Sequence, residues 1–208
     1  MGTTPVRSYQ KLLKKCNVKL KRLEGNFLNR ITSSFELDLP LGLEDMAQHI
    51  EFIVPRIQAW SEDLWEENFY VGKRWKEIRD TDTYHEQVLH LFMPGGEYMV
   101  SLDGDVSKGG WRYLQESNTF IVEYGGKSQL FDLVFLNNDF FILKKHGDQI
   151  RKGKLMYYVY GNERSVGQLD WRNAMEELYN IYRKNSKFTI YILLFLIIIG
   201  GILFFTFA

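Results

Sequence analysis

The sequence predicts an α+β protein in which a small antiparallel β-barrel or half-barrel lies between N-terminal helices and a C-terminal membrane-spanning helix. Three observations predict this fold. Apolar side chains recur at helical spacing in residues 1–70, short β-type runs alternate with turn residues in 71–162, and the last twenty-one residues carry no charged side chain. We therefore divide the chain into segments 1–30, 31–70, 71–162, 163–187 and 188–208.

The first segment, 1–30, predicts a basic amphipathic helix. Tyr9, Leu12, Cys16 and Leu20 recur at steps of three and four, which places them on one face. The opposite face is basic and holds Lys11, Lys14, Lys15, Lys19, Lys21 and Arg22. Such a face suits an anionic lipid surface or an acidic partner. Nucleic acid is less favoured, because no aromatic residues are interleaved with the basic ones.

The second segment, 31–70, predicts an acidic helical region. Arg56 is its only basic residue, so its charge opposes that of the first segment, and the two segments could instead pair with each other in the fold or in an oligomer. Within it, residues 43–68 carry an apolar stripe with acidic residues near the start, where the helix dipole favours negative charge. Pro55 should kink this helix or split it in two.

The third segment, 71–162, predicts an antiparallel meander that closes or half-closes into a barrel. Runs of about six residues rich in β-branched and aromatic side chains are separated by turn residues at spacings of about 8 to 12. We expect tight hairpins with positive backbone φ at Asp103-Gly104, Gly125-Gly126 and Asn137-Asn138. Abundant aromatic residues can fill a small barrel by themselves.

The order of several motifs in this segment resembles small bacterial lipocalin-like (calycin-type) domains over about residues 71–146. The motif residues are Gly72 and Trp75, the Gly95-Gly96-Glu97-Tyr98 turn, Gly110-Trp111, and the run from Phe131 to Leu143. The resemblance implies a compact antiparallel barrel that binds a ligand or partner, with Trp75, Gly110 and Trp111 as structural residues. It implies no catalytic residues. The opening Gly72-Lys73-Arg74-Trp75 has one residue more between glycine and tryptophan than the family's Gly-x-Trp, whereas Gly109-Gly110-Trp111 fits it.

No motif for catalysis or metal binding stands out. His85 and His90 are five residues apart, which on a strand places them on opposite faces. The Asp103-Gly104-Asp105 stretch lacks the later ligands of a calcium loop, and the Gly-Gly-Lys-Ser at 125–128 lacks the first glycine and the helix of a phosphate loop. We predict no cofactor, no metal and no enzyme activity.

The last two segments predict a stalk helix that continues into a membrane anchor. Residues 165–184 carry an apolar stripe, with Asp170 near the start of the helix. Residues 188–208 have the length and apolarity of one transmembrane helix. The basic residues Arg183, Lys184 and Lys187 precede this helix and none follows it, so the upstream domain should lie in the cytoplasm. Gly200 and Gly201 would allow close packing with another membrane helix.

These observations favour a single-pass, tail-anchored membrane protein. Its partners would be the lipid bilayer, a protein or small apolar ligand bound by the barrel, and other copies of the chain. The alternative is a membrane-disrupting effector resembling those of bacterial defence systems, in which the barrel senses a signal and the membrane helices oligomerise. A single cysteine, Cys16, fits a reducing compartment.

Overall fold

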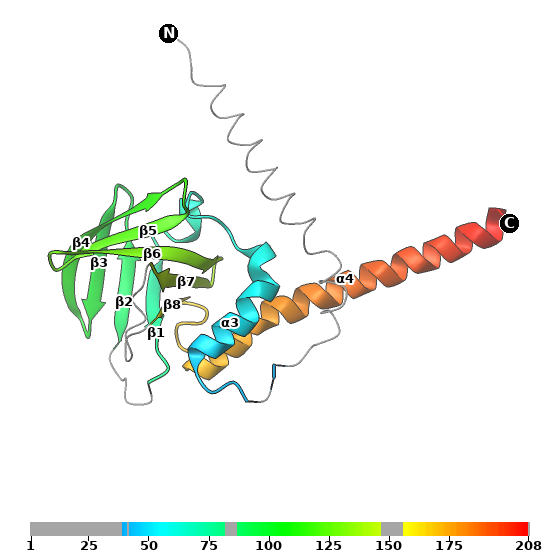
Figure 1. Cartoon of the computed structure of the whole chain (residues 1–208), viewed down its shortest axis with the longest axis horizontal. Helices are drawn as coiled ribbons and strands as arrows, with labels where there is room; N and C mark the ends of the chain where they lie inside the picture. The colour runs from blue at the N-terminus through cyan, green and yellow to red at the C-terminus, as the bar shows by residue number, and fades with distance from the viewer. Residues whose placement is uncertain (1–38, 41, 82–86, 147–155, 208) are drawn as a thin grey trace, which may run out of the picture. The chain divides into compact units, whose positions relative to one another are not determined.

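The fold is a closed eight-stranded antiparallel barrel with helices at its two chain ends (Figure 1). The structure, a computed structural model, describes residues 39, 40, 42–81, 87–146 and 156–207, without the side chains of 186–193 and 200–207. Residues Pro40–Tyr182 form one compact unit. The predicted α+β class and the predicted meander are confirmed, and the meander closes completely.

Each strand of the barrel pairs with the next along the chain, and the last pairs with the first. The strands are β1 (Arg74–Ile78), β2 (Val88–Phe92), β3 (Glu97–Leu102), β4 (Asp105–Leu114), β5 (Thr119–Tyr124), β6 (Lys127–Leu136), β7 (Phe140–Lys145) and β8 (Tyr157–Asn162). Closure comes from the β1–β8 pair, in which Glu77 lies opposite Tyr160. A closed barrel has no edge strand, so its sheet offers no row of unpaired backbone groups to other chains.

The tight hairpins follow the predicted turns with one exception. Asp103 and Gly104 both have positive φ, and so do Gly125 and Gly126, as two-residue hairpin loops require. Asn137-Asn138 does not, so that prediction was wrong. The Asn137 side chain instead accepts hydrogen bonds from the backbone N–H groups of Asp139 at 2.9 Å and Phe140 at 2.7 Å. This local bonding makes a turn without a left-handed residue.

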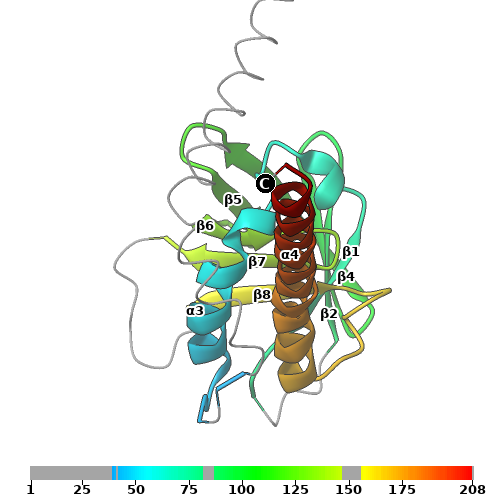
Figure 2. The same ribbon diagram turned by 90° about the vertical axis from the view of Figure 1, so that its right-hand side faces the viewer.

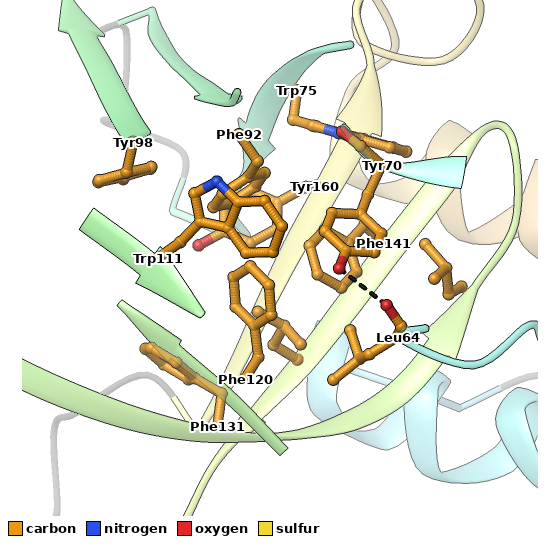
Figure 3. Close-up of a cluster of buried hydrophobic side chains, with 12 residues drawn as sticks. Leu64, Tyr70, Trp75, Phe92, Tyr98, Trp111, Phe120, Phe131, Phe141 and Tyr160 are labelled. Carbon is orange, nitrogen blue, oxygen red and sulfur yellow. Dashed lines mark hydrogen bonds between the residues drawn. The ribbon is translucent and has the colours of Figure 1, made fainter. Parts of the chain in front are cut away.

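Aromatic rings fill much of the barrel interior (Figure 3). Tyr70 lies at the centre of the cluster, with its ring centroid 5.4 Å from those of Trp111 and Phe141 and 5.7 Å from that of Phe120. The edge-to-face and offset contacts in this group are the arrangements that aromatic rings prefer. Trp75 and Trp111, predicted as structural residues, are both buried in it.

One end of the barrel is closed by the segment from Ser61 to Gly72, which we call the plug. Its backbone is held to the barrel by hydrogen bonds, for example from Glu62 N–H to the carbonyl oxygen of Leu136 at 2.8 Å. The Tyr70 hydroxyl donates to the carbonyl oxygen of Leu64, and the Trp75 indole N–H donates to that of Tyr70. These hydrogen bonds pair the hydroxyl and the carbonyl oxygen of Tyr70 while the plug carries its large ring into the core.

Two helices cover the outer face of β7 and β8 (Figure 2). Helix α3 (Met46–Ile57) begins at Asp45, whose side chain accepts a hydrogen bond from Gln48 N–H, and two short 3₁₀ helices, η1 (Gln58–Trp60) and η2 (Glu67–Phe69), follow it. Helix α4 (Trp171–Phe207) buries Ala174, Met175, Leu178, Tyr179 and Tyr182. Contacts between the rings of His49 and Trp171 join the two helices.

Pro55 lies inside α3, which ends two residues later, at Ile57, so the predicted helical region 43–68 is interrupted soon after the proline. One detail of the helical predictions was wrong. The stalk helix begins at Trp171 and not at residue 165, because the backbone N–H groups of Ser165, Val166 and Gly167 all donate to the carbonyl oxygen of Asn162 in a turn. Asp170 does lie at the helix start, as predicted, and accepts from Asn173 N–H at 2.9 Å.

Helix α4 continues without a break to Phe207. Its six apolar residues from Leu194 to Ile199 are all exposed, from 37% at Ile199 to 69% at Ile197. In the part of the chain that the structure describes, we find no helix long and apolar enough to cross a membrane. The anchor therefore stays a prediction.

Candidate functional site

Polar side chains interrupt the aromatic interior on three neighbouring strands. Residues two apart on a strand point to the same side of the sheet, so Glu77 on β1 shares the inner face with Trp75, and His90 on β2 shares it with Phe92. Tyr98 on β3 lies opposite Phe92. Glu77 is 6% exposed and His90 7%, and Glu77 is the one buried carboxylate among the described residues.

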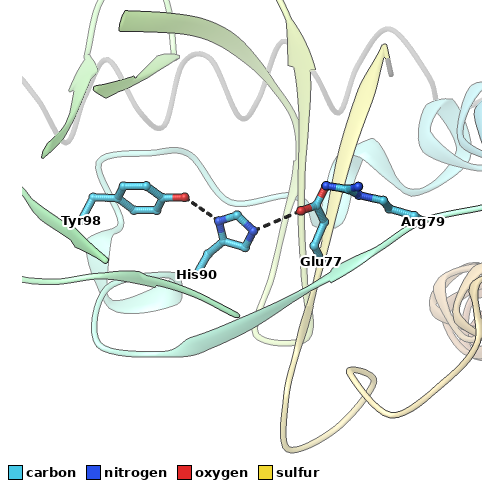
Figure 4. A network of polar contacts seen from close by, with 4 residues as sticks. All are labelled: Glu77, Arg79, His90 and Tyr98. Carbon is cyan, nitrogen blue, oxygen red and sulfur yellow. Dashed lines mark hydrogen bonds and ion pairs between the residues drawn. The ribbon is translucent and has the colours of Figure 1, made fainter. Parts of the chain in front are cut away.

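These side chains form one hydrogen-bonded chain, shown in Figure 4. The Tyr98 hydroxyl oxygen lies 2.6 Å from His90 Nδ1, and His90 Nε2 lies 3.3 Å from Glu77 Oε2. Arg79 follows β1 and donates from Nε to Glu77 Oε1 at 2.8 Å. We call the four residues the polar chain.

The hydrogen-bond partners of His90 determine which of its two ring nitrogens carries the hydrogen in the neutral imidazole. An ionised carboxylate only accepts hydrogen bonds, so Nε2 carries the proton that points to Glu77. Nδ1 then accepts from the Tyr98 hydroxyl. Every member of the polar chain has a partner, which is the condition under which a buried polar network is tolerated.

The polar chain keeps Glu77 ionised. Burial by itself would raise the pKa of Glu77, but the hydrogen bonds from His90 and Arg79 and the positive charge of Arg79 outweigh it, so the pKa lies below its usual value. A buried ion pair of this kind is often no more stabilising than apolar side chains of the same volume. The surrounding aromatic rings stabilise the core, so stability alone does not explain why a polar chain lies within it.

Further tyrosines face the polar chain from β8. The Tyr160 ring centroid lies 4.6 Å from that of His90, and the Tyr160 side chain is only 5% exposed. Its hydroxyl makes no hydrogen bond with any described residue. Burial, together with Tyr98 and the charge of Glu77, raises the pKa of Tyr160, and burial and Glu77 do the same for Tyr158. Both phenols therefore stay neutral and can donate a hydrogen bond.

The inner wall of the barrel beside the polar chain is apolar, and its side chains are less buried than those of the aromatic cluster. Val100, Val122, Leu133 and Tyr158 are half-buried and pack against the aromatic cluster. The arrangement offers hydrogen-bonding groups and a fixed charge next to apolar surface, which is typical of small-molecule sites. Among the described residues, no three His, Cys, Asp or Glu side chains gather as a metal site would require.

The residues predicted from the sequence as site residues lie elsewhere. Trp75 and Trp111 belong to the core, where the Trp111 indole N–H donates to the carbonyl oxygen of Met93, and Gly110 pairs with Glu97 and Glu123 in the β4 ladder. Arg183 and Lys184 lie on α4. Lys187, Gly200 and Gly201 also lie on α4, in the part whose side chains the structure does not describe. The remaining predicted residues lie outside the described residues: Lys11, Lys14, Lys15, Lys19, Lys21 and Arg22.

Sequence reasoning missed the polar chain. A signal was present, because Trp75, Glu77 and Arg79 alternate with period two, as do His90 and Phe92. Each pattern predicts which residues share one face of a strand, but neither predicts that the two strands are neighbours in the sheet. That requires the pairing of β1 with β2.

No family model, curated protein or solved structure matches this chain.

Proposed function

We propose that the protein is a membrane-tethered binding module whose barrel takes a small ligand at the polar chain, and that it is not an enzyme. The observation that carries the proposal is a buried Glu77–His90–Tyr98 chain with an ionised carboxylate, with the Tyr160 hydroxyl beside it, in an otherwise aromatic interior. The Tyr160 hydroxyl has no hydrogen-bond partner among the described residues, so a ligand that bonds to it would gain this hydrogen bond without breaking one inside the protein.

The barrel form supports the same reading. A closed antiparallel barrel with aromatic filling is consistent with the lipocalin-like resemblance, whose general use is ligand or partner binding. Fold alone does not assign function, so the resemblance supports the proposal and the site carries it.

The tether is proposed from the sequence of residues 188–208 and from helix α4. A run without charge, continuous with a helix that reaches Phe207, has the length of a membrane span. Six exposed apolar side chains in a row would be costly in water and suit a lipid environment. Arg183, Lys184 and Lys187 would then hold the barrel on the cytoplasmic side.

A first experiment tests the tether. The full chain with an N-terminal tag is expressed in bacteria, and membranes are washed with alkaline carbonate. We expect the protein to resist extraction and the barrel to be digested by protease only when the cytoplasmic face is accessible. Release by carbonate would refute the anchor, and digestion of the barrel in intact spheroplasts, where only the outer face of the membrane is accessible, would refute its orientation.

A second experiment tests ligand binding. Small molecules that co-purify with the full chain are identified by mass spectrometry for the unchanged protein, for Tyr160→Phe and for Glu97→Gln. Glu97 is an exposed residue paired with Lys108, so it serves as the control. A compound enriched in the unchanged protein and in Glu97→Gln, but reduced in Tyr160→Phe, supports the proposal. Equal amounts in all three would contradict it.

One observation favours the effector alternative. Helix α4 is a single helix that contains both the buried residues Leu178 and Tyr182 and the apolar run, so one element belongs to the barrel unit and to the proposed effector segment. Replacing residues 188–208 with an unrelated apolar helix of equal length decides between the two. A binding module should keep its ligand and oligomeric mass, whereas an effector should lose its oligomer and any effect on host viability.

A further inference from the structure

The charge of the ligand can be inferred from the same site, and this inference rests on the proposed binding function. We infer that the polar chain, together with Tyr160, recognises an organic cation, namely a primary ammonium carried on an aromatic or short apolar group. The groups that point to it are the Glu77 carboxylate, the unpartnered Tyr160 hydroxyl and the aromatic faces around them.

The first step is the sign of the charge. Glu77 is 4% exposed at its side chain, whereas Arg79, its cationic partner, is 30% exposed. Water screens the more exposed charge more strongly, so Glu77 dominates the potential within the barrel. In agreement, Glu77 raises the pKa values of Tyr158 and Tyr160, while the opposing effect of Arg79 is smaller. A cation is attracted to such a position and an anion is repelled.

The second step is the arrangement of the rings. The ring centroids of His90, Phe92 and Phe141 lie 4.6, 6.4 and 5.9 Å from that of Tyr160. Figure 3 labels Phe92, Phe141 and Tyr160. The faces of aromatic rings are electron-rich and attract ammonium groups, most strongly where water is excluded. The phenol and carboxylate oxygens can accept the N–H groups of a primary ammonium.

The third step concerns the rest of the ligand. Val100, Val122 and Leu133 are only half-buried and pack against the aromatic cluster. Contact with them favours a ligand whose ammonium is attached to an apolar or aromatic group. Arg79 can keep its charge in water at the partly exposed end of the polar chain when an ammonium takes a place at Glu77.

The test uses three probes with the same phenyl ring and two-carbon arm: phenethylamine, 2-phenylethanol and 3-phenylpropionate, which are cationic, neutral and anionic at pH 7. Binding to the full chain in lipid nanodiscs is measured by calorimetry, with empty nanodiscs as a blank. We expect phenethylamine to bind at least about tenfold more tightly than 2-phenylethanol, and 3-phenylpropionate to bind more weakly still.

The variants locate the effect. Glu77→Gln should remove the preference for the cation, and Tyr160→Phe, which keeps the ring, should weaken phenethylamine several-fold. Glu97→Gln makes the same chemical change on the outer surface and should leave binding unchanged. Circular dichroism checks that each variant is folded. Tyr160→Phe keeps the test valid if Glu77→Gln does not fold.

Two results would overturn the inference in different ways. If 2-phenylethanol or 3-phenylpropionate binds as tightly as phenethylamine and depends on Tyr160, the barrel is a binding module but not one for cations. If phenethylamine does not bind, or binds equally to all variants, the ammonium site does not exist. The co-purification experiment then still decides the proposed function separately.

Discussion

Gly109 and Gly110 are adjacent on β4, yet the structure predicts opposite outcomes when each is changed to alanine. A Cβ atom at Gly109 would lie 2.2 Å from the carbonyl oxygen of Glu123 and 3.2 Å from the Tyr98 ring. At Gly110 the nearest atom would be the carbonyl oxygen of Gly96 at 3.6 Å, which is an ordinary contact. Neither glycine has positive φ, so the difference comes from packing alone.

The magnitude follows from the displacement required. Relieving a 2.2 Å approach to a backbone oxygen requires β4 and β5 to separate by roughly 1 Å, because the obstacle is not a flexible side chain. Overpacking of this kind costs about 3 kcal/mol and should lower the melting temperature by roughly 10 °C. Gly110→Ala should be neutral or stabilise by a few tenths of a kcal/mol, since alanine restricts the unfolded chain.

The assay is thermal unfolding of the full chain in detergent, followed by tryptophan fluorescence, because Trp75 and Trp111 are buried in the barrel. The two variants differ by one position and share the same substitution, so each controls for the other. If both melt within about 2 °C of each other, the close approach of β4 and β5 at Gly109 is not a feature of the protein.

Three further predictions concern polar groups. Glu77→Gln should lower stability at pH 7 by about 3 kcal/mol. It should also make the free energy of unfolding less dependent on pH in acid. The lowered pKa of Glu77 adds stability that is complete above its ordinary pKa of 4.5 and is lost as pH falls through the folded value. A variant whose stability falls in acid as steeply as that of the unchanged protein would contradict this. Tyr98→Phe should cost about 1 to 2 kcal/mol in urea unfolding, because it leaves His90 Nδ1 unpaired, whereas Tyr160→Phe should cost less than about 0.5; equal costs would refute the difference between the two hydroxyls. Asp45→Ala should cost about 1 kcal/mol by removing the cap of α3, and Asp45→Asn should recover most of it; an Asn variant as unstable as Ala would show that the cap contributes little.

The local structure of the chain was predictable because it depends on neighbouring residues. Turns at Asp103-Gly104 and Gly125-Gly126 need positive φ, which those residues supply at low cost. The cap at Asp170 depends on a hydrogen bond to a residue three positions away. The local pattern gave a wrong start for the stalk helix before Trp171, because three backbone N–H groups donate to the carbonyl oxygen of Asn162 and form a turn there.

The candidate site was not predictable in the same way. Glu77 lies in a strand and Arg79 directly after it, in a stretch whose sequence also fits a half-exposed surface, and His90 is thirteen residues beyond Glu77. Tyr160 enters only because β8 closes the barrel against β1. The role of Tyr70 likewise depends on the plug, which is bonded to β6 by residues far apart in the sequence, for example Leu136 N–H to the Ser61 hydroxyl across 75 residues.

The sequence by itself therefore determined where the strands and most of the tight turns and helix caps occur, and it predicts an apolar end suited to a bilayer. Only the tertiary structure decided that the meander closes, that Tyr70 fills one end, and that Glu77, His90, Tyr98 and Tyr160 meet inside. The physical reason is range: propensity and hydrogen bonding to near neighbours act within a few residues, whereas burial of a charge depends on which distant strands pack around it.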